Sequence, residues 1–241
     1  MSFSKKLLQN LESEAISIIR DSYSKSSNPV MMYSIGKDSS VLLHLARKAF
    51  FPSIVPFPLL HIDTKWKFKE MIKFRTYVKN KFKLNLITYT NQKGIKLNPQ
   101  KDKNYTDVMK TKALKDALDK YQFDVIYGGA RRDEEASRSK ERIVSVRDKG
   151  HIWNPKNQKP ELWNLFNYEK DEDQTLRVFP ISNWTEFDIW NYIKQENIEI
   201  VDLYFAKKRK SIKKNNAYFI IDDNRYKLQK GEKIITETIR F

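Results

Sequence analysis

The spacing of apolar residues switches, in the first part of the chain, from a helical period to a short apolar run and back. Within residues 7–22, apolar side chains recur at steps of three and four, which places them on one face of a helix. The chain breaks at Asn28-Pro29, and residues 30–33 form an apolar run typical of a buried strand. Helical spacing resumes over residues 41–50. We therefore predict a helix, a strand and a second helix, with a polar turn between the last two.

The same alternation continues through the middle of the chain. Strands are predicted at 58–62, 84–89 and 123–127, helices at 68–82 and 106–120, and a polar loop at 91–104. Strands that alternate with helices indicate βαβ units and a parallel sheet. We predict an α/β fold with a mostly parallel central sheet, helices on both faces and a partly irregular C-terminal region.

The pattern weakens beyond Arg147. The tryptophans of residues 151–163 suggest core packing, although this segment could also be a lid or a partner surface. One more strand is predicted at 177–181, and Thr185 with Asp188 three positions later is typical of a helix cap. After Lys207 the charge is dense and no element is predicted.

Polar segments follow three of the predicted strands, at residues 34–40, at Asp63-Thr64 and at residues 128–133. In parallel α/β sheets, ligands bind outside the carboxyl ends of the strands. We therefore expect these segments to meet at one edge of the sheet. His44 and His61 lie beside them in apolar surroundings, and we expect both to be packed rather than catalytic.

The first polar segment has the composition of a phosphate cradle. A glycine lets the backbone approach an anion, and the N–H groups at the start of the next helix carry partial positive charge. Three hydroxyls and a lysine add donors, while the carboxylate makes sense if it holds Mg²⁺. An ordinary capped turn is the alternative, and the spacing is not that of a Walker A loop. The residues are Ser34, Ile35, Gly36, Lys37, Asp38, Ser39 and Ser40.

Composition narrows the possibilities. The chain has 46 Lys and Arg against 30 Asp and Glu, a net charge of +16, which suits a polyanionic partner such as a nucleotide or a nucleic acid. The basic residues are spread along the chain, so we expect no nucleic-acid partner.

The chain has no cysteine, which excludes disulfides and cysteine nucleophiles. No apolar run is long enough for a membrane span or a signal peptide, and we expect a soluble, cytoplasmic protein.

Taken together, the motifs resemble the small-subunit family of bacterial sulfate adenylyltransferases, PP-loop ATP pyrophosphatases of the PAPS reductase superfamily. The resemblance implies a fold like that of the adenine nucleotide alpha hydrolases. It also implies an N-terminal helix at 1–27, a PP-loop domain at 28–190 and a C-terminal extension at 191–241. The matching segments are 28–41, 42–50, 56–64, 106–111, 128–135, 155–163, 177–186 and 221–225.

The family implies a reaction in which ATP and sulfate give adenylyl sulfate and pyrophosphate, the first step of sulfate assimilation. It implies a GTPase large subunit as partner, Mg²⁺ with ATP, and no tightly bound organic cofactor or membrane. Residues 34–40 would hold the β and γ phosphates with help from Lys37, and Asp38 would contact the metal.

Further roles follow from the same resemblance. Asp63 would be a second metal ligand or an adenosine contact. Arg131 and Arg132 would hold sulfate and the α phosphate, since guanidinium groups suit tetrahedral oxyanions. Gly128 and Gly129 would let the backbone approach closely. A structural ion pair with Asp133, Glu134 or Glu135 is the alternative for these arginines.

The sequence departs from the family in three places. Family members usually continue beyond the point where this chain ends, so we expect an effect on GTPase docking and on closure of the site. Lys65 stands where the family has glycine, and the loop at 91–105 is shorter.

There are three alternative functions. A reductase of adenylyl sulfate needs a cysteine that is absent here. The other two alternatives are a tRNA-modifying pyrophosphatase and a catalytically weakened remnant with a binding or regulatory role.

Overall fold

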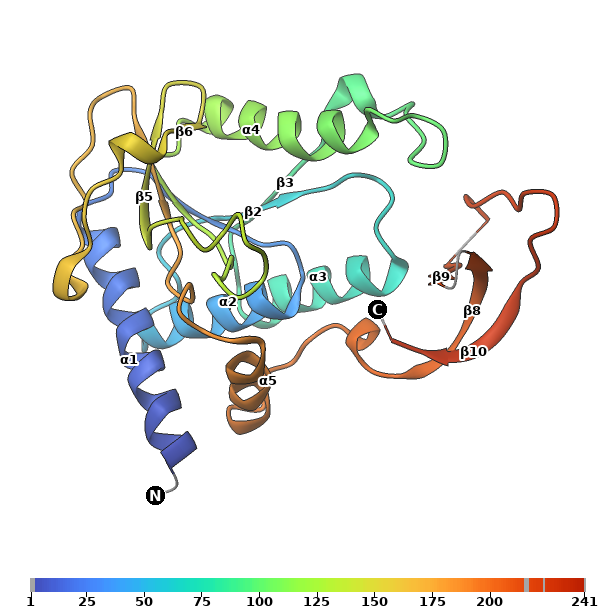
Figure 1. Ribbon diagram of the computed structural model, residues 1–241, viewed down its shortest axis with the longest axis horizontal. Coiled ribbons are helices and arrows are strands. Elements are labelled where there is room, and N and C mark those ends of the chain that lie inside the picture. The colour runs from blue at the N-terminus through green and yellow to red at the C-terminus, as the bar shows by residue number, and fades with distance from the viewer. Residues whose placement is uncertain (1–2, 215–216, 223, 241) are drawn as a thin grey trace.

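The computed structural model describes residues 3–214, 217–222 and 224–240, so Asp223 of the segment 221–225 lies outside the described residues. A seven-stranded sheet has the strand order β3-β2-β1-β4-β7-β5-β6 (Figure 1). Its first five strands in this order are parallel, while β5 and β6 are antiparallel additions at one edge. The mostly parallel sheet is therefore confirmed. The strands are β1 (Pro29–Met32), β2 (Leu59–Ile62), β3 (Leu86–Tyr89), β4 (Val125–Tyr127), β5 (Val144–Asp148), β6 (Ile152–Trp153) and β7 (Thr175–Val178).

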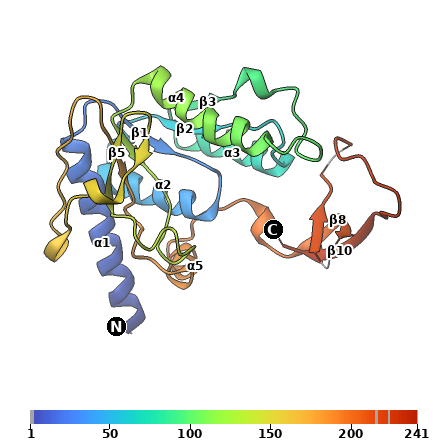
Figure 2. The ribbon, with the colours of Figure 1, turned by 45° about the horizontal axis from the view of Figure 1, so that its top comes forward.

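Helices cover both faces of this sheet (Figures 1 and 2). Successive strand residues point to opposite faces, so that Val30 packs against α4 while Met31 joins the larger core with α1, α2, α3 and α5. The first helix shares this larger core, and the division of the chain at residue 27 stays a prediction. The helices are α1 (Phe3–Ser24), α2 (Lys37–Phe50), α3 (Lys69–Lys81), α4 (Ala113–Tyr121) and α5 (Glu186–Gln195).

The elements predicted within residues 7–127 agree with the observed ones apart from details, whereas the strand predicted at 177–181 lies at Thr175–Val178 and β5 and β6 were not predicted. The helix α2 begins at Lys37, inside the polar turn. A π-helical stretch, Asp107–Lys112, precedes α4 in the segment that was predicted as one helix. The expected cap of α5 is confirmed, because Thr185 Oγ1 accepts from the Asp188 amide and the Asp188 side chain accepts from the Thr185 amide. Among the described helices, none has the length and apolar character that crossing a membrane requires.

Beyond Lys207, where the sequence predicts no element, the partly irregular C-terminal region contains a small sheet. Strands β8 (Lys207–Lys214), β9 (Ala217–Ile220) and β10 (Ile235–Ile239) form an antiparallel sheet in the order β10-β8-β9. The central strand β8 has five lysines and buries only Arg209, Ser211 and Ile212, so it lacks the apolar alternation that indicates a strand. This small sheet lies beside the carboxyl edge of the main sheet (Figure 2).

Three contacts tie the small sheet and its loops to the start of α3. Arg209 pairs with Glu70 at 2.6 Å, and the Asp222 carboxylate accepts from the Lys69 amide. The Arg225 guanidinium donates to the carbonyl oxygens of Lys65 and Lys67, the latter at 3.2 Å. The segment after β2 and the start of α3 are therefore held by the small sheet and its loops.

Candidate nucleotide site

The sheet topology brings the predicted segments together. From β1 the chain runs outward to β2 and β3 on one side, and then returns to add β4 on the other side of β1. In folds of this kind, nucleotides bind at the carboxyl ends of the strands where the strand order reverses, which here are the ends of β1 and β4. A Cβ atom on Gly129, after β4, would lie 3.3 Å from backbone atoms of Asp38 and Ser39. Gly129 therefore packs closely against the first turn of α2, while its predicted approach to a bound anion stays a prediction.

The loop after β1, which is the predicted cradle, lacks the side-chain cap that an ordinary capped turn would have. Helix α2 is capped by Gly36, which has no side chain with which to bond the first-turn amides. The hydroxyls of Ser39 and Ser40 both donate to the Gly36 carbonyl, at 2.9 and 3.0 Å. Ile35 is buried with φ of 70°, which turns the chain sharply before the helix. The amides of residues 37–39 have no acceptor within the helix, and they form its positive end.

Two cations meet two carboxylates beside this cradle. Arg131 Nε donates to Asp38 Oδ1 at 2.8 Å, and its NH2 group donates to Glu186 Oε2 at 2.7 Å. Lys37 Nζ lies 3.1 Å from Asp38 Oδ2 and 3.3 Å from Glu186 Oε2. Burial lowers the pKa of Lys37, but the carboxylates of Asp38 and Glu186 outweigh it and the net shift is upward. Lys37 is therefore held as a cation.

The two predicted arginines point to different surroundings. Arg131 is 3% exposed and reaches the cradle through Asp38, while also lying 3.5 Å from Asp133 and 3.9 Å from Glu134. The ion pairs of the alternative interpretation are thus present along with the link to the loop. Arg132 instead donates to Asn183 Oδ1 at 2.7 Å and to the Glu141 carbonyl. The structure joins Arg131, but not Arg132, to the cradle by a direct contact.

Asp63 ends β2 at the same edge but is held locally. Its Oδ1 accepts from the Lys65 amide at 2.8 Å, and its Oδ2 lies 3.4 Å from Arg75 NH1. Burial raises the pKa of Asp63, while the Lys65 amide and the charges of Lys65 and Arg75 bring it below the usual value. Lys65 has φ of 64°, the left-handed region that favours glycine, at a cost of roughly 1 kcal/mol. The substitution noted in the sequence therefore falls on a strained position.

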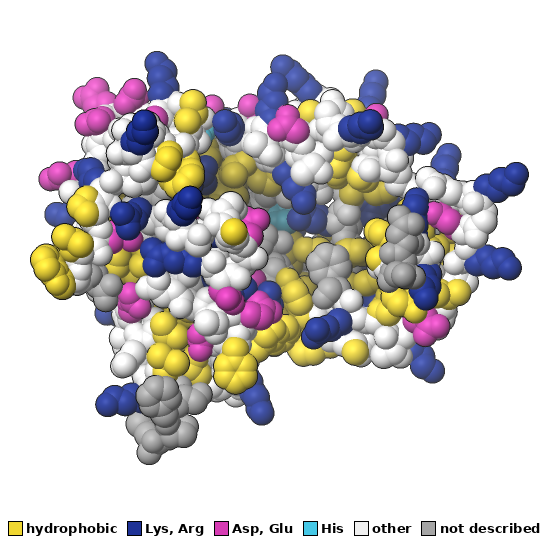
Figure 3. Space-filling view, viewed as in Figure 1, with side chains coloured by type: hydrophobic (Ala, Val, Ile, Leu, Met, Phe, Trp, Pro, Cys, Tyr) yellow, Lys and Arg dark blue, Asp and Glu magenta, His cyan; other side chains and the backbone are white. Residues whose placement is uncertain are grey.

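A cavity of about 980 Å³ lies between the carboxyl edge and the small C-terminal sheet. Ser34, Gly36 and Thr64 line it from the main sheet, so the segments after β1 and β2 share one space. Figure 3 looks onto the hollow between the two parts, where apolar side chains gather, whereas Lys and Arg are spread over the whole visible face. Burial and the charges of Lys110 and Arg75 lower the pKa of Lys67 in this wall. The cavity is therefore partly aromatic and locally basic.

Several residues of the site and its cavity were not identified from the sequence. Glu186 and Arg225 fall inside segments that match the family, which was a usable signal, although neither was assigned a role. Lys110 also falls inside a matching segment, while the others come from segments without a phosphate-binding pattern, and only the fold places them together. The cavity-lining residues of this kind are Trp66, Lys67, Tyr105, Lys110, Tyr204 and Arg225.

The histidines and tryptophans near these segments can now be placed. His61 is 1% exposed and its Nδ1–H donates to the Tyr33 carbonyl at 2.7 Å, while His44 lies 3.4 Å from Glu196. Both are packed, as expected. Trp163 is 85% exposed with φ of 53°, so the interpretation of this tryptophan as core was wrong. It lies in a short, kinked 3-10 helix (Leu162–Asn164), and the nearby Leu162 and Leu165 are also exposed.

The residues present do not fit a resident metal centre at Asp38. One carboxylate oxygen already accepts from Arg131 and the other from Lys37. Two cations at about 3 Å oppose a divalent cation on the same carboxylate. Within the described part of the chain, no group of three or more His, Asp or Glu side chains is arranged to hold a metal ion.

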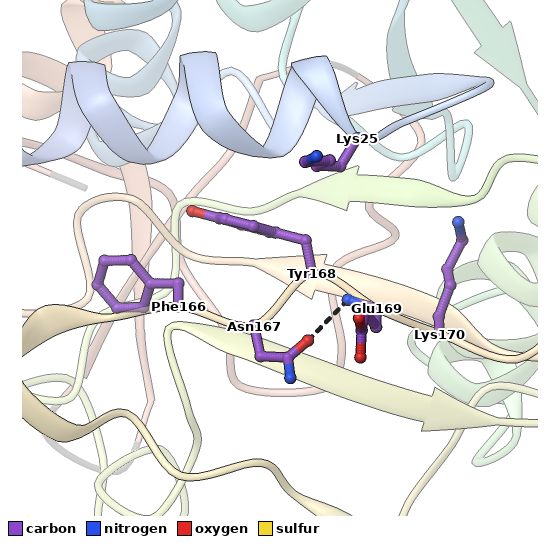
Figure 4. A pocket seen from close by; sticks show the side chains of 6 residues that line it. All are labelled: Lys25, Phe166, Asn167, Tyr168, Glu169 and Lys170. Carbon is purple, nitrogen blue, oxygen red and sulfur yellow. Dashed lines mark hydrogen bonds between the residues drawn. The ribbon is translucent and has the colours of Figure 1, made fainter.

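A second hollow, of about 580 Å³, lies at the opposite edge of the sheet (Figure 4). Lys25 precedes β1 and Lys170 precedes β7, which places the hollow at the amino ends of the strands. Its floor is formed by residues 166–170, where Asn167 Oδ1 accepts from the Glu169 amide at 2.9 Å. It contains none of the predicted site residues and lies away from the end at which α/β sheets bind ligands.

Comparison with known proteins agrees with this geometry. The phosphoadenosine phosphosulfate reductase domain family matches residues 28–219. Among solved structures, the fold is similar to FMN adenylyltransferase of Candida glabrata in complex with ATP, with a TM-score of 0.60 and 18% identity over 88% of this chain and 67% of that one. It is also similar to phosphoadenylyl-sulfate reductase of Candida auris, with a TM-score of 0.55 and 14% identity over 84% and 92%. These structural likenesses support the fold alone.

The fold, the cradle and the domain match define an α/β nucleotide-binding enzyme of the phosphoadenosine phosphosulfate reductase domain class. The chain is 56% identical to sulfate adenylyltransferase subunit 2 of Aliivibrio fischeri and 54% identical to that of Psychromonas ingrahamii, over 97% of this chain and 79% of each relative. The chain belongs to the sulfate adenylyltransferase subunit 2 family, whose members are nucleotidyltransferases.

Proposed function

We propose that the chain is the catalytic subunit that transfers the adenylyl group of ATP to sulfate. A sulfate oxygen forms a bond to the α phosphorus, the bond from this phosphorus to the bridging oxygen breaks, and pyrophosphate leaves with the electron pair. Two findings support the proposal: the family to which the chain belongs, and the open cradle at the start of α2. The cradle carries the argument, because uncapped helix amides beside two cations bind a polyphosphate.

Sulfate is already deprotonated and needs no general base. The chemical difficulty is to bring two anions together and to stabilise the leaving pyrophosphate, which is a matter of position and electrostatics. We assign the β and γ phosphates to the loop 34–40 and Lys37. We assign the α phosphate and sulfate to Arg131 and Arg132, with the Gly128–Gly129 backbone allowing close approach.

In this proposal Mg²⁺ arrives with ATP as part of the substrate. Because both oxygens of Asp38 accept from cations, we assign Asp38 the task of orienting Lys37 and Arg131 rather than that of a metal ligand. Asp63 keeps the proposed role of an adenosine-side contact, through Thr64, which lines the cavity next to it.

We also propose that a GTPase subunit is the partner and that its GTP hydrolysis drives the uphill synthesis of adenylyl sulfate. The relatives are named as subunit 2 of a sulfate adenylyltransferase, which supports a partner subunit. One assay tests both parts: sulfate-dependent release of pyrophosphate from ATP, with and without a cognate GTPase and GTP. Release that rises when the GTPase and GTP are added supports the coupling, and no release under either condition refutes the enzymatic proposal.

The substitution Asp38→Asn tests the orienting role. Loss of this charge frees Lys37 and Arg131 from their shared partner, and we expect a fall in kcat of about 100-fold, the effect of removing one preorganised group from such a site. Asp173→Asn, on an exposed turn, is the matched control and should keep wild-type activity. Circular dichroism and urea unfolding establish that the variant is folded. A folded Asp38→Asn protein with wild-type turnover would refute the assignment.

A further inference from the structure

A carboxylate from a distant element occupies the space between the two cations of the site. Glu186 is the first residue of α5, and its Oε2 lies 2.7 Å from Arg131 NH2 and 3.3 Å from Lys37 Nζ. One oxygen thus bridges the two cations assigned to substrate phosphates or sulfate. This is the arrangement that an oxygen of a phosphate would make with the same groups.

The two carboxylates that share these cations differ in how freely they can leave. The Asp38 side chain is 16% exposed and Arg131 is 3% exposed, so their pair is enclosed. The Glu186 side chain is 50% exposed. A side chain that is half in water is rehydrated at little cost when it moves, whereas an enclosed one is not. Glu186 is therefore the carboxylate that can move away at the lower cost.

We propose that Glu186 is a positioning residue that acts as a placeholder for a substrate oxygen. Before nucleotide binds, it holds Lys37 and Arg131 in the geometry that the anion needs, and phosphate oxygens of ATP replace it. The inference rests on the proposed function, since it concerns the same polyphosphate site. The Glu186 carboxylate also competes with the anion. The apparent affinity for the anion is lowered, because only the fraction of molecules from which this carboxylate has moved can bind it.

A tryptophan contacts Glu186 and should respond when this carboxylate moves. The other carboxylate oxygen, Oε1, accepts from Trp190 Nε1 at 2.9 Å. The Trp190 ring packs edge-on against Tyr204 with centroids 6.1 Å apart, and Lys37 Nζ lies 5.6 Å from the Tyr204 ring centroid. When Glu186 leaves, Trp190 loses its hydrogen-bond acceptor. Indole fluorescence therefore reports the movement directly.

A purely structural role for Glu186 gives a different expectation. An acidic residue in the first turn of a helix is stabilised by the helix dipole, typically by 0.3–1 kcal/mol. If this were its whole role, replacing it would lower the stability of α5 without changing anion affinity. The affinity for pyrophosphate separates the two roles.

The first experiment measures the Kd of pyrophosphate by titration calorimetry for the wild type, Glu186→Gln and Glu199→Gln. Glutamine keeps the size of the side chain but removes the competing charge, so we expect Glu186→Gln to bind pyrophosphate about five- to tenfold more tightly. Glu199 is the matched control: it is 47% exposed and pairs with Lys81 and Tyr77 rather than with the site. Its variant should bind as the wild type does.

Unchanged or weaker binding by Glu186→Gln would overturn the placeholder role while leaving the proposed function intact. If the wild type itself binds neither pyrophosphate nor ATP, both the inference and the proposed function fail. The second experiment needs only folded wild type and Trp190→Phe. Pyrophosphate should change the tryptophan fluorescence of the wild type, and Trp190→Phe should lose most of this change. An equal change in both proteins would contradict displacement of Glu186.

Discussion

At the scale of single residues, the clearest consequence of burial concerns His61. Its Nδ1–H is bonded to the Tyr33 carbonyl, and its Nε2 has no hydrogen-bond partner among the described residues. Burial, opposed by that hydrogen bond and assisted by the charges of Lys67 and Arg75, lowers the pKa of His61 to about 4. Protonation would place a second N–H and a charge in an enclosed space.

This makes folding sensitive to mild acid. The unfolded histidine binds a proton near pH 6.5, whereas the folded one binds it near pH 4, so the unfolded state is favoured progressively as pH falls across this window. Across the whole window, the free energy of unfolding falls by roughly 3 kcal/mol. The neutral side chain of His61→Gln can still donate to Tyr33. We expect urea unfolding to show that the free energy of unfolding falls less for this variant than for the wild type between pH 6.5 and 5. Equal losses would contradict the assignment.

Single residues also show where sequence reasoning succeeds. The cradle could be predicted because its groups are contiguous and follow a strand, so local chemistry and local structure coincide. The partner of Lys37 and Arg131 could not, because Glu186 reaches them only after α5 has packed beside the sheet. The contact depends on tertiary packing, and the periodicity of the sequence carries no information about it.

At the scale of elements, α5 shows how a short signal fixes a functional position. The Thr185 and Asp188 side chains each bond the other's amide, and this cap sets where the helix begins. Glu186 follows directly, so the cap also sets the position of the carboxylate that faces Lys37. The cap was recognisable from the sequence. The strand β8 was not, because its lysines hide the burial of Arg209, Ser211 and Ile212.

Thr185→Ala tests the importance of this cap. Loss of the hydroxyl leaves the Asp188 amide without its acceptor, and we expect the free energy of unfolding to fall by about 1 kcal/mol. Thr76→Ala is a suitable control, since Thr76 is an exposed residue within α3 whose hydroxyl bonds the Ile72 carbonyl. It should be neutral or slightly stabilising. Equal stability of the two variants would show that the cap contributes nothing.

At the scale of the whole molecule, the cavity of the candidate site is formed jointly by the two sheets. The main sheet supplies the cradle, while residues of the small sheet and its loops supply the facing wall. The parallel sheet and the meeting of the polar segments at its edge could be predicted, because both follow from strand and helix alternation. The facing wall could not, because nothing in its charged sequence distinguishes it from a solvated surface.

Arg225 offers a test of this joint construction. Its guanidinium donates to the carbonyls of Lys65 and Lys67 and lies 5.4 Å from the Trp66 ring centroid. Hydrogen bonds from a charged group contribute about 1.5–3 kcal/mol, so we expect Arg225→Ala to weaken ATP binding by about tenfold or more. Lys230→Ala, at an exposed position of the same region, should bind ATP normally. Wild-type ATP affinity in a folded Arg225→Ala protein would show that this contact does not shape the cavity.

The pair of Asp38 and Arg131 joins positions that are 93 residues apart in the chain. Contacts this distant form only after the intervening strands have paired, since the loop that they close is costly before then. A chain in which only β1, β2 and β3 had associated would carry the phosphate loop without its arginine. The capacity to hold a polyphosphate should therefore emerge late in folding, and the rate at which nucleotide binding appears on dilution from urea should follow the docking of β4 rather than the formation of α2.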